Sequence, residues 1–597
     1  MEKLVLLLGL FVAGSVAAEP WDTFSDTWVA TDALGRKLPT AEEVGAPRRD
    51  RFVGMFYYVW HGAHGYATHY DPELGPDAGQ GVLLPDPVKD AMAPFDITKI
   101  MAAPRGTREW GPEHRFHHWG EPLFGYYVAN DEWVVRHHAQ MLVDAGVDVV
   151  LFDATNGFHY RDIYMNLCRI YMEIRAEGGR TPQIAFLCNG SLEEQAENSV
   201  TALYRDLYQP GKYGELWFFW KGKPLILGMP SVFTDEMKDF FTIRNSWAAS
   251  RHPITGEPMP WFGDGKDCWN WLDTTPQNPG WHEAPDQPEQ VPVSPAEHPH
   301  RDYGKSYHDG EPMHPPSPAE GFYFSEQWNR ALELDPEFIL ITQWNEWVAQ
   351  RFINDGPENF NFKTYAGKPV GPDDTVFIDA FTSEYNRDLE PMMGGYGDNY
   401  YYQMIANIRR FKGVRKPPFE GRTQRFYDSK HDTTSRNHFG WGGVGRYVDT
   451  TGRNDFQTAQ VKYDSGLFNF AVQTVEPITP PAGENWMELF IAVDIPAAPT
   501  WEGYQYRIRL EPEVKQWYIV EQSLGGFQWR GIGKVEYEVD GQVLKLSVPH
   551  SLLPGTDAGF RFKWSDNRQT TQAIDWLRHG DAAPNGRFQY EYRIKLR

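Results

Sequence analysis

Between about residues 50 and 413, short apolar runs rich in β-branched residues alternate with stretches whose apolar positions recur at helical spacing. Helical patterns occur, for example, over 131–145, 162–175 and 325–334. This alternation is typical of βα units that build a parallel sheet, and eight of them predict a (β/α)8 TIM barrel. The eight candidate strands are 52–60, 147–152, 183–188, 224–228, 241–245, 291–294, 338–342 and 376–380.

The pattern changes at a proline pair near 413–421, where the sequence reads GVRKPPFEG. Beyond it, short alternating strands separated by turn residues predict an all-β sandwich. We therefore expect a (β/α)8 domain over 19–415 and a β-sandwich over 420–597. The clearest candidate strands of the sandwich are 467–474, 487–493, 504–510, 515–521, 535–539 and 543–548.

The first 18 residues have the features of an export signal. Lys3 precedes the apolar run 4–12, and small residues at 16–18 precede a cleavage site at Glu19. We therefore expect a signal peptide over 1–18 and a secreted or periplasmic protein. No later stretch approaches the ~18 continuous apolar residues of a membrane span, so membrane insertion is not expected.

Charge and composition exclude several classes of protein. The 81 Asp and Glu exceed the 57 Lys and Arg, which gives a formal net charge of −24. Such a chain would repel phosphate backbones, so a nucleic-acid partner is not expected. The 23 Trp, 30 Tyr and 36 Phe supply ample apolar area for a core, which excludes disorder as the main state.

The strongest chemical signal is the run 338–347, an apolar strand that ends in Trp344, Asn345, Glu346 and Trp347. A carboxylate between two indoles has the setting of a sugar-site acid, because the rings stack on sugars and apolar surroundings raise the carboxyl pKa. The alternative is a salt bridge at the barrel rim with tryptophans in the core. We favour Glu346 as a catalytic carboxylate.

A second acidic segment follows an excursion of the chain over 348–375. Glycoside hydrolysis needs two carboxyl groups that flank the scissile bond, about 5–10 Å apart. We select Glu384 and Glu390 as candidate catalytic partners, which requires the excursion to form one wall of the site. Asp388 is expected to form an ion pair with its neighbour Arg387.

Other predicted strands also end in polar or aromatic residues, which would converge at one end of a barrel. Taken singly, each could equally cap a helix or bond a neighbour. The histidines show no HExxH or comparable spacing, so we expect no metal and no organic cofactor. The candidate substrate contacts are Trp60, His61, Asp153, Asn189, Asn245, Trp247, Glu297, His298, Trp344, Asn345 and Trp347.

Two segments carry a family resemblance. Residues 343–347 (QWNEW), Leu389-Glu390-Pro391 and the tyrosines at 396 and 400–402 resemble the glycoside hydrolase family 71/99-like superfamily, including its WbsX-like group. The resemblance implies a TIM-barrel hydrolase acting on glycans, and family 99 itself cleaves internal α-mannosides.

The sequence departs from family 99 at one catalytic position. Ala349 stands three residues after Glu346, where that family has its second catalytic glutamate. The partner would then be Glu384 or Glu390, or else Asp153 or Glu297 from another strand end. Mannose specificity is not carried over.

The C-terminal part resembles family 9 carbohydrate-binding modules and related DOMON-like sandwiches, through 485–494 (NWMELFIAVD) and 501–504 (WEGY). The resemblance implies a sugar-binding appendage. A sandwich that packs on the barrel for purely structural reasons is equally open.

Together these patterns predict a secreted glycoside hydrolase that cleaves a poly- or oligosaccharide by carboxylate acid/base catalysis. One alternative is a glycan-binding protein without catalysis, which Ala349 keeps open. Another is a polysaccharide lyase on uronic acids, with basic residues that neutralise the uronate. The residues that could do so are Arg51, Arg244, Arg351 and Arg387.

Overall fold

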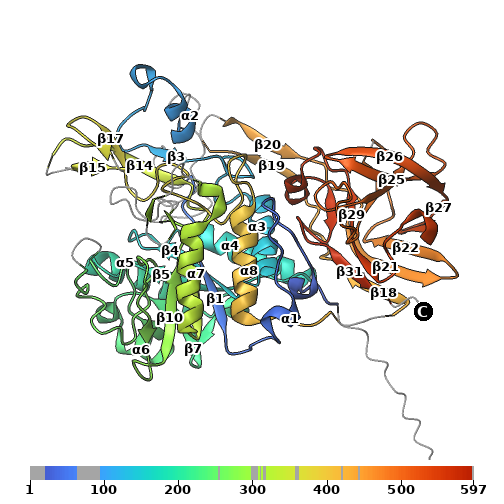
Figure 1. Cartoon of the computed structure of the whole chain (residues 1–597). Coiled ribbons are helices and arrows are strands. Elements are labelled where there is room, and N and C mark those ends of the chain that lie inside the picture. The colour runs from blue at the N-terminus through green and yellow to red at the C-terminus, as the bar shows by residue number, and fades with distance from the viewer. Residues whose placement is uncertain are drawn as a thin grey trace, which may run out of the picture.

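The computed structural model has two bodies side by side, a mixed α/β body built by the first two thirds of the chain and an all-β body built by the last third (Figure 1). The predicted signal peptide and the site candidates Glu297 and His298 lie outside the described residues. The structure describes residues 21–62, 95–252, 256–296, 307–308, 311–312, 317–356, 362–366, 368–417, 421–441, 444–483 and 485–594.

A curled parallel sheet forms the centre of the α/β body. Its parallel strands lie in the spatial order β8, β7, β5, β4, β1, β13, β10, and the short strands β6 and β9 add antiparallel pairs. The first seven predicted strands are confirmed. Their bounds are β1 (Phe52–Tyr57), β4 (Val149–Ala154), β5 (Gln183–Cys188), β7 (Lys223–Leu227), β8 (Thr242–Arg244), β10 (Pro288–Val293) and β13 (Phe338–Trp344), with β6 (Phe219–Trp220) and β9 (Gly280–Trp281) beside them.

The prediction of a closed eight-stranded barrel is only partly confirmed. Between β8 and β10 the described chain makes single parallel bridges, Asn245 to Cys268 and Lys266 to Trp281, in place of a full ladder. The eighth predicted strand, 376–380, is wrong, because β17 (Thr375–Phe377) pairs antiparallel with β14 (Val348–Ile353) outside the curled sheet. The excursion after β13 therefore builds a sheet of its own.

Amphipathic helices cover the outside of the curled sheet. In α3, for example, Trp133, Val134, Met141 and Leu142 are buried, and Gly146 ends the helix in the left-handed region at φ 88°. The helices are α3 (Glu132–Ala145), α4 (Arg161–Ala176), α5 (Glu193–Leu203), α6 (Asp235–Phe240), α7 (Phe322–Leu334) and α8 (Asn399–Lys412), with the short α1 (Ala41–Val44) and α2 (Ile97–Ala102).

A small four-stranded sheet, in the order β17, β14, β3, β2, lies at the top of the α/β body (Figure 1). Strand β14 starts four residues after β13 ends and pairs with β3 through Val348, Ala349 and Gln350. The small sheet therefore begins at the C-terminal edge of the curled sheet. The remaining short strands are β2 (Phe95–Asp96), β3 (Phe116–His118), β11 (Tyr307–His308), β12 (Glu311–Pro312), β15 (Thr364–Tyr365) and β16 (Lys368–Pro369).

The all-β region contains two antiparallel sheets, which confirms the predicted sandwich architecture. Strand β22 alternates buried and more exposed positions, as expected where one face of a strand meets the core. One sheet contains β18 (Thr423–Tyr427), β21 (Phe456–Asp464), β22 (Leu467–Thr474), β28 (Val543–Pro549) and β27 (Tyr537–Asp540); the other contains β26 (Gln528–Val535), β25 (Tyr518–Gly525), β24 (Tyr506–Leu510), β23 (Glu488–Ala492), β29 (Gly559–Asp566), β30 (Asp581–Ala583) and β31 (Tyr590–Arg593).

The two bodies are joined by extensive contacts. The hairpin of β19 (Arg436–Phe439) and β20 (Arg446–Asp449) reaches the α/β body, where Arg436 Nε donates to Asp131 Oδ2 at 2.8 Å. The start of the chain joins both bodies, since Val29 bridges to Gln589 and Arg409 Nη2 donates to Ser25 O at 2.7 Å. The apolar core is continuous across the junction.

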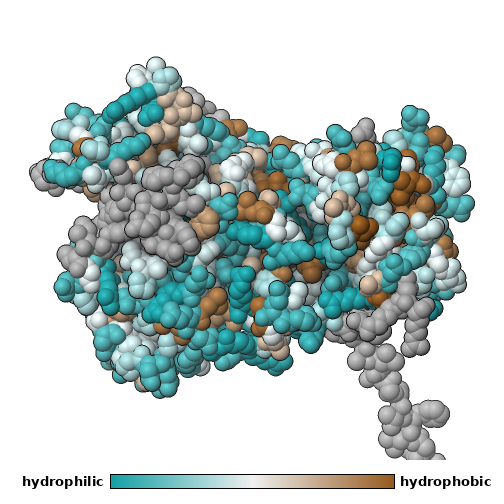
Figure 2. Space-filling view, in the orientation of Figure 1, coloured by the Kyte–Doolittle hydropathy of each residue, from teal (hydrophilic) through white to brown (hydrophobic). Residues whose placement is uncertain are grey.

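The surface is mostly hydrophilic on the face drawn in Figure 2, and its apolar residues are scattered rather than gathered in one band. Among the helices in the described part of the chain, none combines the length and the apolar character that crossing a bilayer requires.

Candidate active site

A cavity of about 290 Å³ opens at the C-terminal ends of β1, β4 and β13. Three carboxylates line it, from Glu346, Asp153 and Asp379. The convergence of polar groups at strand ends is therefore confirmed. The other lining residues are Phe56, Tyr58, Trp60, Thr155, Asn156, Trp247, Ala248, Trp271, Leu272, Thr342 and Gln343.

An irregular end of β13 positions Glu346. The register with β1 shifts between the pairs Ile341–Met55 and Trp344–Tyr57, and Gln343 and Asn345 adopt positive φ values of 72° and 63°. Non-glycine residues rarely adopt this conformation, and local strain of this kind is common at functional sites.

Side-chain bonds hold this strand end in place. Asn345 Oδ1 accepts from Tyr58 N and Asn345 Nδ2 donates to Tyr58 O, both at 2.9 Å. Asp388 accepts from the backbone amides of Asn345 at 2.8 Å and Glu346 at 2.7 Å. Asp388 is therefore a backbone clamp rather than the expected ion-pair partner of Arg387, which donates to the carbonyl oxygens of Glu384 and Pro295.

Burial raises the pKa of Glu346 well above its ordinary value, since the residue is only 9% exposed. The negative charges of Asp379 and Asp388 raise this pKa further, and hydrogen bonds from Tyr58 and Gln343 partly oppose the shift. The site thus favours a protonated Glu346 beside other carboxylates.

Asp153 has a different environment from Glu346. Burial raises the pKa of Asp153, but several hydrogen bonds act in the opposite direction. The Thr155 backbone amide donates to it at 2.9 Å, the Thr155 hydroxyl at 2.7 Å and Trp60 Nε1 at 2.8 Å. Asp379, which follows β17, is exposed at the cavity. The three carboxylates thus differ in burial and in hydrogen bonding.

Two buried polar atoms of lining residues have no hydrogen-bond partner among the described residues. They are Gln343 Oε1 and Trp271 Nε1, one acceptor and one donor. Buried polar atoms are normally satisfied, and an unpaired one in a cavity calls for an explanation. Hydroxyl groups of a bound ligand would satisfy both.

Of the residues selected from the sequence, four line the cavity: Glu346, Asp153, Trp60 and Trp247. His61 does not; it is 2% exposed beside Tyr127, and burial lowers its pKa to about 3.

Asn189 and Asn245 also lie outside the lining. Asn189 Oδ1 accepts from the amides of Ser191 and Leu192 just before α5, and Asn245 Nδ2 donates to Trp261 O at 2.8 Å. These two residues bond the protein's own backbone, which was the structural alternative to a substrate contact.

The expectation that Glu390 or Glu384 faces Glu346 is not met, because neither residue lines the cavity. Glu390 is fully buried; its Oε2 accepts from Trp347 Nε1 and from the Tyr127 hydroxyl, both at 2.6 Å. Its Oε1 lies 3.1 Å from His138 Nε2. The physical reason is the Asp388 clamp, which also accepts from Glu390 N and so fixes this segment behind the strand end.

The two strand-end indoles also face away from the cavity. Trp347 stacks on Trp119 with ring centroids 4.7 Å apart, and Trp344 contacts His138 and Tyr401. The described residues of the excursion 348–375 do not line the cavity either. Its return strand, β17, instead brings Asp379 to the site.

Sequence reasoning did not select Asp379, Tyr58, Gln343 or Trp271. A usable signal existed for Asp379, which lies near the end of the predicted strand 376–380, where the strand-end rule places functional residues. Tyr58 and Gln343 belonged to strand-end runs that were already singled out. Trp271 had no comparable signal.

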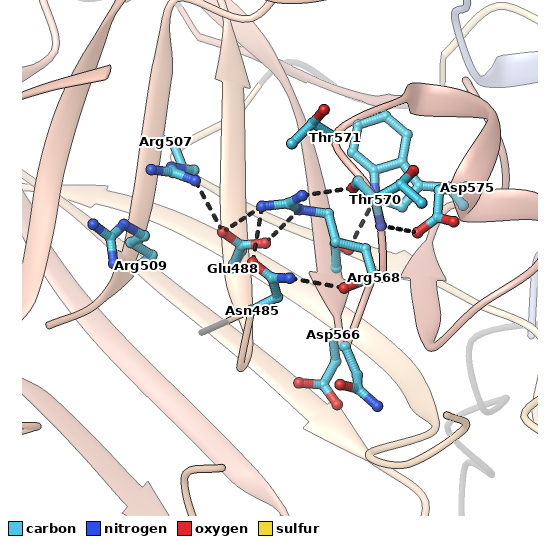
Figure 3. A network of polar contacts seen from close by, with 12 residues as sticks. Asn485, Glu488, Arg507, Arg509, Asp566, Arg568, Thr570, Thr571 and Asp575 are labelled. Carbon is cyan, nitrogen blue, oxygen red and sulfur yellow. Dashed lines mark hydrogen bonds and ion pairs between the residues drawn. The ribbon is translucent and has the colours of Figure 1, made fainter. Parts of the chain in front are cut away.

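The sandwich contains a second polar network, drawn in Figure 3. Glu488 is fully buried, and its carboxylate lies 2.8 Å from Arg568 Nε and 3.5 Å from Arg507 Nη1. Asn485 Nδ2 donates to Arg568 O at 2.7 Å. These pairs connect β23, β24 and the end of β29. Sugar binding by the sandwich stays a prediction.

Comparisons with known proteins give remote structural likenesses. The chain is similar to the GH99 endo-alpha-mannosidase from Bacteroides thetaiotaomicron, at 16% identity and a TM-score of 0.32, over 62% of this chain and 99% of that one. It is similar to the same enzyme in complex with bis-tris-propane at 14% identity and a TM-score of 0.31, over 61% and 97% of the two chains. No protein-family model and no curated protein matches the sequence. Function therefore has to be inferred from the cavity.

Proposed function

We propose that the protein is an exported glycoside hydrolase that cleaves a poly- or oligosaccharide in the cavity at the end of β13. One observation carries the proposal: Glu346, Asp379 and Asp153 line a single cavity together with Tyr58, Trp60, Trp247 and Trp271. Paired carboxylates supply acid/base chemistry, and aromatic rings bind sugar faces.

Glu346 is the general acid in this proposal. Its raised pKa keeps a proton available near neutral pH for the departing glycosidic oxygen. Tyr58 and Gln343 orient the carboxyl group, and Asp388 fixes the backbone that carries it. Asp388 touches only protein, so it is a positioning residue.

Asp379 is the partner carboxylate, acting as nucleophile or as the base that activates water. Its negative charge raises the pKa of Glu346, and the two carboxylates line the same cavity. Two neighbouring carboxyl groups acquire different pKa values, because ionisation of one disfavours ionisation of the other. A pair with one acid and one base requires such a difference. Asp153, held by Trp60 and Thr155, is suited to accept hydrogen bonds from sugar hydroxyls.

The two alternatives have less support. A uronate lyase needs basic groups, but among the described residues none that lines the cavity is Lys or Arg. Arg51 is paired with Asp335, and Arg244 with the buried Glu289. A binding protein without catalysis was suggested by the absence of a second glutamate at position 349, and Asp379 now offers the second carboxylate.

The test is a screen of the mature protein against plant, algal and microbial polysaccharides, with analysis of reducing ends and of products absorbing in the ultraviolet. We expect hydrolysis products from at least one glycan. Glu346→Gln keeps the side-chain volume and removes the acid, so it should lower kcat by about 10³-fold or more without changing the melting temperature. Near-normal turnover by this variant would overturn the assignment, and unsaturated products would favour the lyase.

A further inference from the structure

Four aspartates crowd together where the sandwich meets the α/β body. One carboxylate oxygen from each of Asp432, Asp455 and Asp581 lies within 4.8 Å of the other two. Asp428, just after β18, is a further carboxylate of this region, since its negative charge raises the pKa of Asp581 and the charge of Asp432 raises the pKa of Asp428. These groups come from three separate segments of the sandwich.

The Asp428 carboxylate lacks a normal set of partners. The residue is 1% exposed, and neither of its side-chain oxygens accepts a hydrogen bond of good geometry from the described residues. The same holds for both oxygens of Asp432 and for Oδ1 of Asp455. The Ser429 amide lowers the pKa of Asp428 and the Asn585 side chain lowers that of Asp432, but burial and neighbouring carboxylates raise both pKa values well above the ordinary value. Native proteins seldom leave so many buried acceptors unpaired.

Few basic side chains face this charge among the described residues. Lys563, fully buried, acts on Asp428 and Asp581, and its Nζ donates to the carbonyl oxygen of Pro584. His431 acts on Asp455. Asp144 of α3 adds another negative group from the α/β body, and burial raises its pKa to about 7.

We propose that Asp432, Asp455 and Asp581 bind a divalent cation, Ca²⁺, which ties the sandwich together at its junction with the α/β body. An all-oxygen donor set selects hard cations. Ca²⁺ binds oxygen at 2.3–2.6 Å, so two ligands of one ion can be about 5 Å apart, which fits the observed spacing. Mg²⁺ demands shorter bonds and a nearly ideal octahedron, which suits a broad carboxylate cluster less well.

The ion would join segments that are distant in sequence. Asp428 and Asp432 lie between β18 and β19, Asp455 precedes β21, and Asp581 begins β30. Asp581 also accepts from the amide of Phe456 at 2.6 Å, and Asp455 from that of His431 at 2.8 Å, so the backbone already holds the loops in register. Asp432 and Asp581 line a cavity that α3 and α8 close from the other body. The bound ion would therefore have a structural role at the junction, away from the carboxylates of the proposed active site.

The first test uses the full mature chain. Metal analysis of protein purified without chelator should give about one calcium per chain. After removal of the ion with a chelator, added Ca²⁺ should raise the melting temperature by roughly 5 °C, and Mg²⁺ by less. Terbium luminescence, sensitised by the nearby Tyr590 and Trp576, should appear on titration with Tb³⁺ and disappear with excess Ca²⁺. No calcium, no shift and no terbium signal would overturn the proposal.

Matched variants locate the site. Asp432→Asn and Asp581→Asn should abolish the Ca²⁺-dependent rise in melting temperature and weaken Tb³⁺ binding at least 10-fold. Asp540→Asn removes one charge from an exposed position in the same domain and should leave both readouts unchanged. A Ca²⁺ response that survives Asp432→Asn would place the ion elsewhere and overturn the assignment. If a variant fails to fold, the terbium titration of the wild-type protein still decides whether a site exists.

Discussion

Two groups of crowded carboxylates, one in the cavity at the end of β13 and one at the junction of the two bodies, differ in what surrounds them. In the cavity, Asp153 accepts bonds from an indole and a hydroxyl, and Glu346 lies beside a phenol and an amide. At the junction, Asp428 and Asp432 have oxygens that accept no hydrogen bond from the residues the structure describes. Repulsion between carboxylates can be relieved by a bound proton or by a bound cation. We expect a proton in the cavity, where hydrogen-bond donors and aromatic rings line the site, and a cation at the junction.

The largest effect is expected from a substitution among the carboxylates that line the cavity. Asp379→Asn removes the proposed partner carboxylate at constant volume, so kcat/KM on a responsive glycan should fall by about 10³-fold or more. The melting temperature should stay within ~2 °C, because Asp379 is exposed. Asp373→Asn removes an exposed charge from the same excursion and serves as the control. Equal activity of both variants would show that Asp379 is not the partner.

The opposite pattern, a loss of stability without a large loss of activity, is expected for Glu390, a buried structural carboxylate. Glu390→Gln loses charge-assisted bonds to Trp347 and Tyr127, so the free energy of unfolding should fall by about 2–4 kcal/mol. Chemical denaturation measures this loss. The kcat of the folded fraction should change by less than about 10-fold, and Glu384→Gln should affect both quantities least. A loss of kcat at unchanged stability would show instead that Glu390 has a catalytic role.

The pH profile sharpens the role of Glu346. A general acid works while protonated, so kcat/KM should decline as pH rises through its raised pKa. The Tyr58 hydrogen bond favours the charged form, so Tyr58→Phe should raise this pKa and move the alkaline limb upward by about 0.5–1 unit. Tyr57→Phe, whose hydroxyl contacts His138 instead, should leave the limb in place. A downward shift for Tyr58→Phe would contradict the assigned role.

A smaller effect is expected from the aromatic lining. Trp247→Ala removes a stacking surface while leaving the carboxylates in place, so KM should rise by up to about 10-fold with kcat within about 2-fold. Trp261→Ala changes a nearby indole that does not line the cavity and provides the comparison. A fall in kcat alone would mean that Trp247 positions the reacting groups rather than the sugar.

The smallest effect tests whether the two carboxylate groups are independent. Asp428→Asn should change kcat/KM by less than about 2-fold at 25 °C, and Glu346→Gln should retain the Ca²⁺-dependent rise in melting temperature. Steady-state kinetics and thermal unfolding of both variants check this. A large loss of activity in Asp428→Asn would show instead that the junction and the cavity are energetically coupled.

The sequence predicted seven strands of the curled sheet and the sandwich because continuous apolar runs and alternation report burial directly. It predicted that polar residues at strand ends converge, and Glu346 and Asp153 do line one cavity because parallel strands end at one edge. It selected Glu390 over Asp379 because spacing along the chain does not show which way a side chain faces. The clamp made by Asp388 decides that, and it depends on backbone amides that no pattern records.

The junction aspartates were missed for a related reason. They lie in segments separated by strands of both sheets, and each alone reads as an ordinary loop residue. A metal site assembled from distant segments has no spacing motif. Only the folded arrangement brings Asp432, Asp455 and Asp581 within reach of one ion.

The start of the chain has a consequence for how the molecule folds. Val29 pairs with Gln589, near the opposite terminus, and Arg415 near the end of the α/β body bonds Asp22 and Asp26. The Arg415 contacts can form as soon as the α/β body has been synthesised, whereas the Val29 pair has to wait for residue 589. Closing the longer loop is entropically slower, although the added cost grows only with the logarithm of length. The N-terminal segment therefore docks in two stages, first on the α/β body and then on the sandwich.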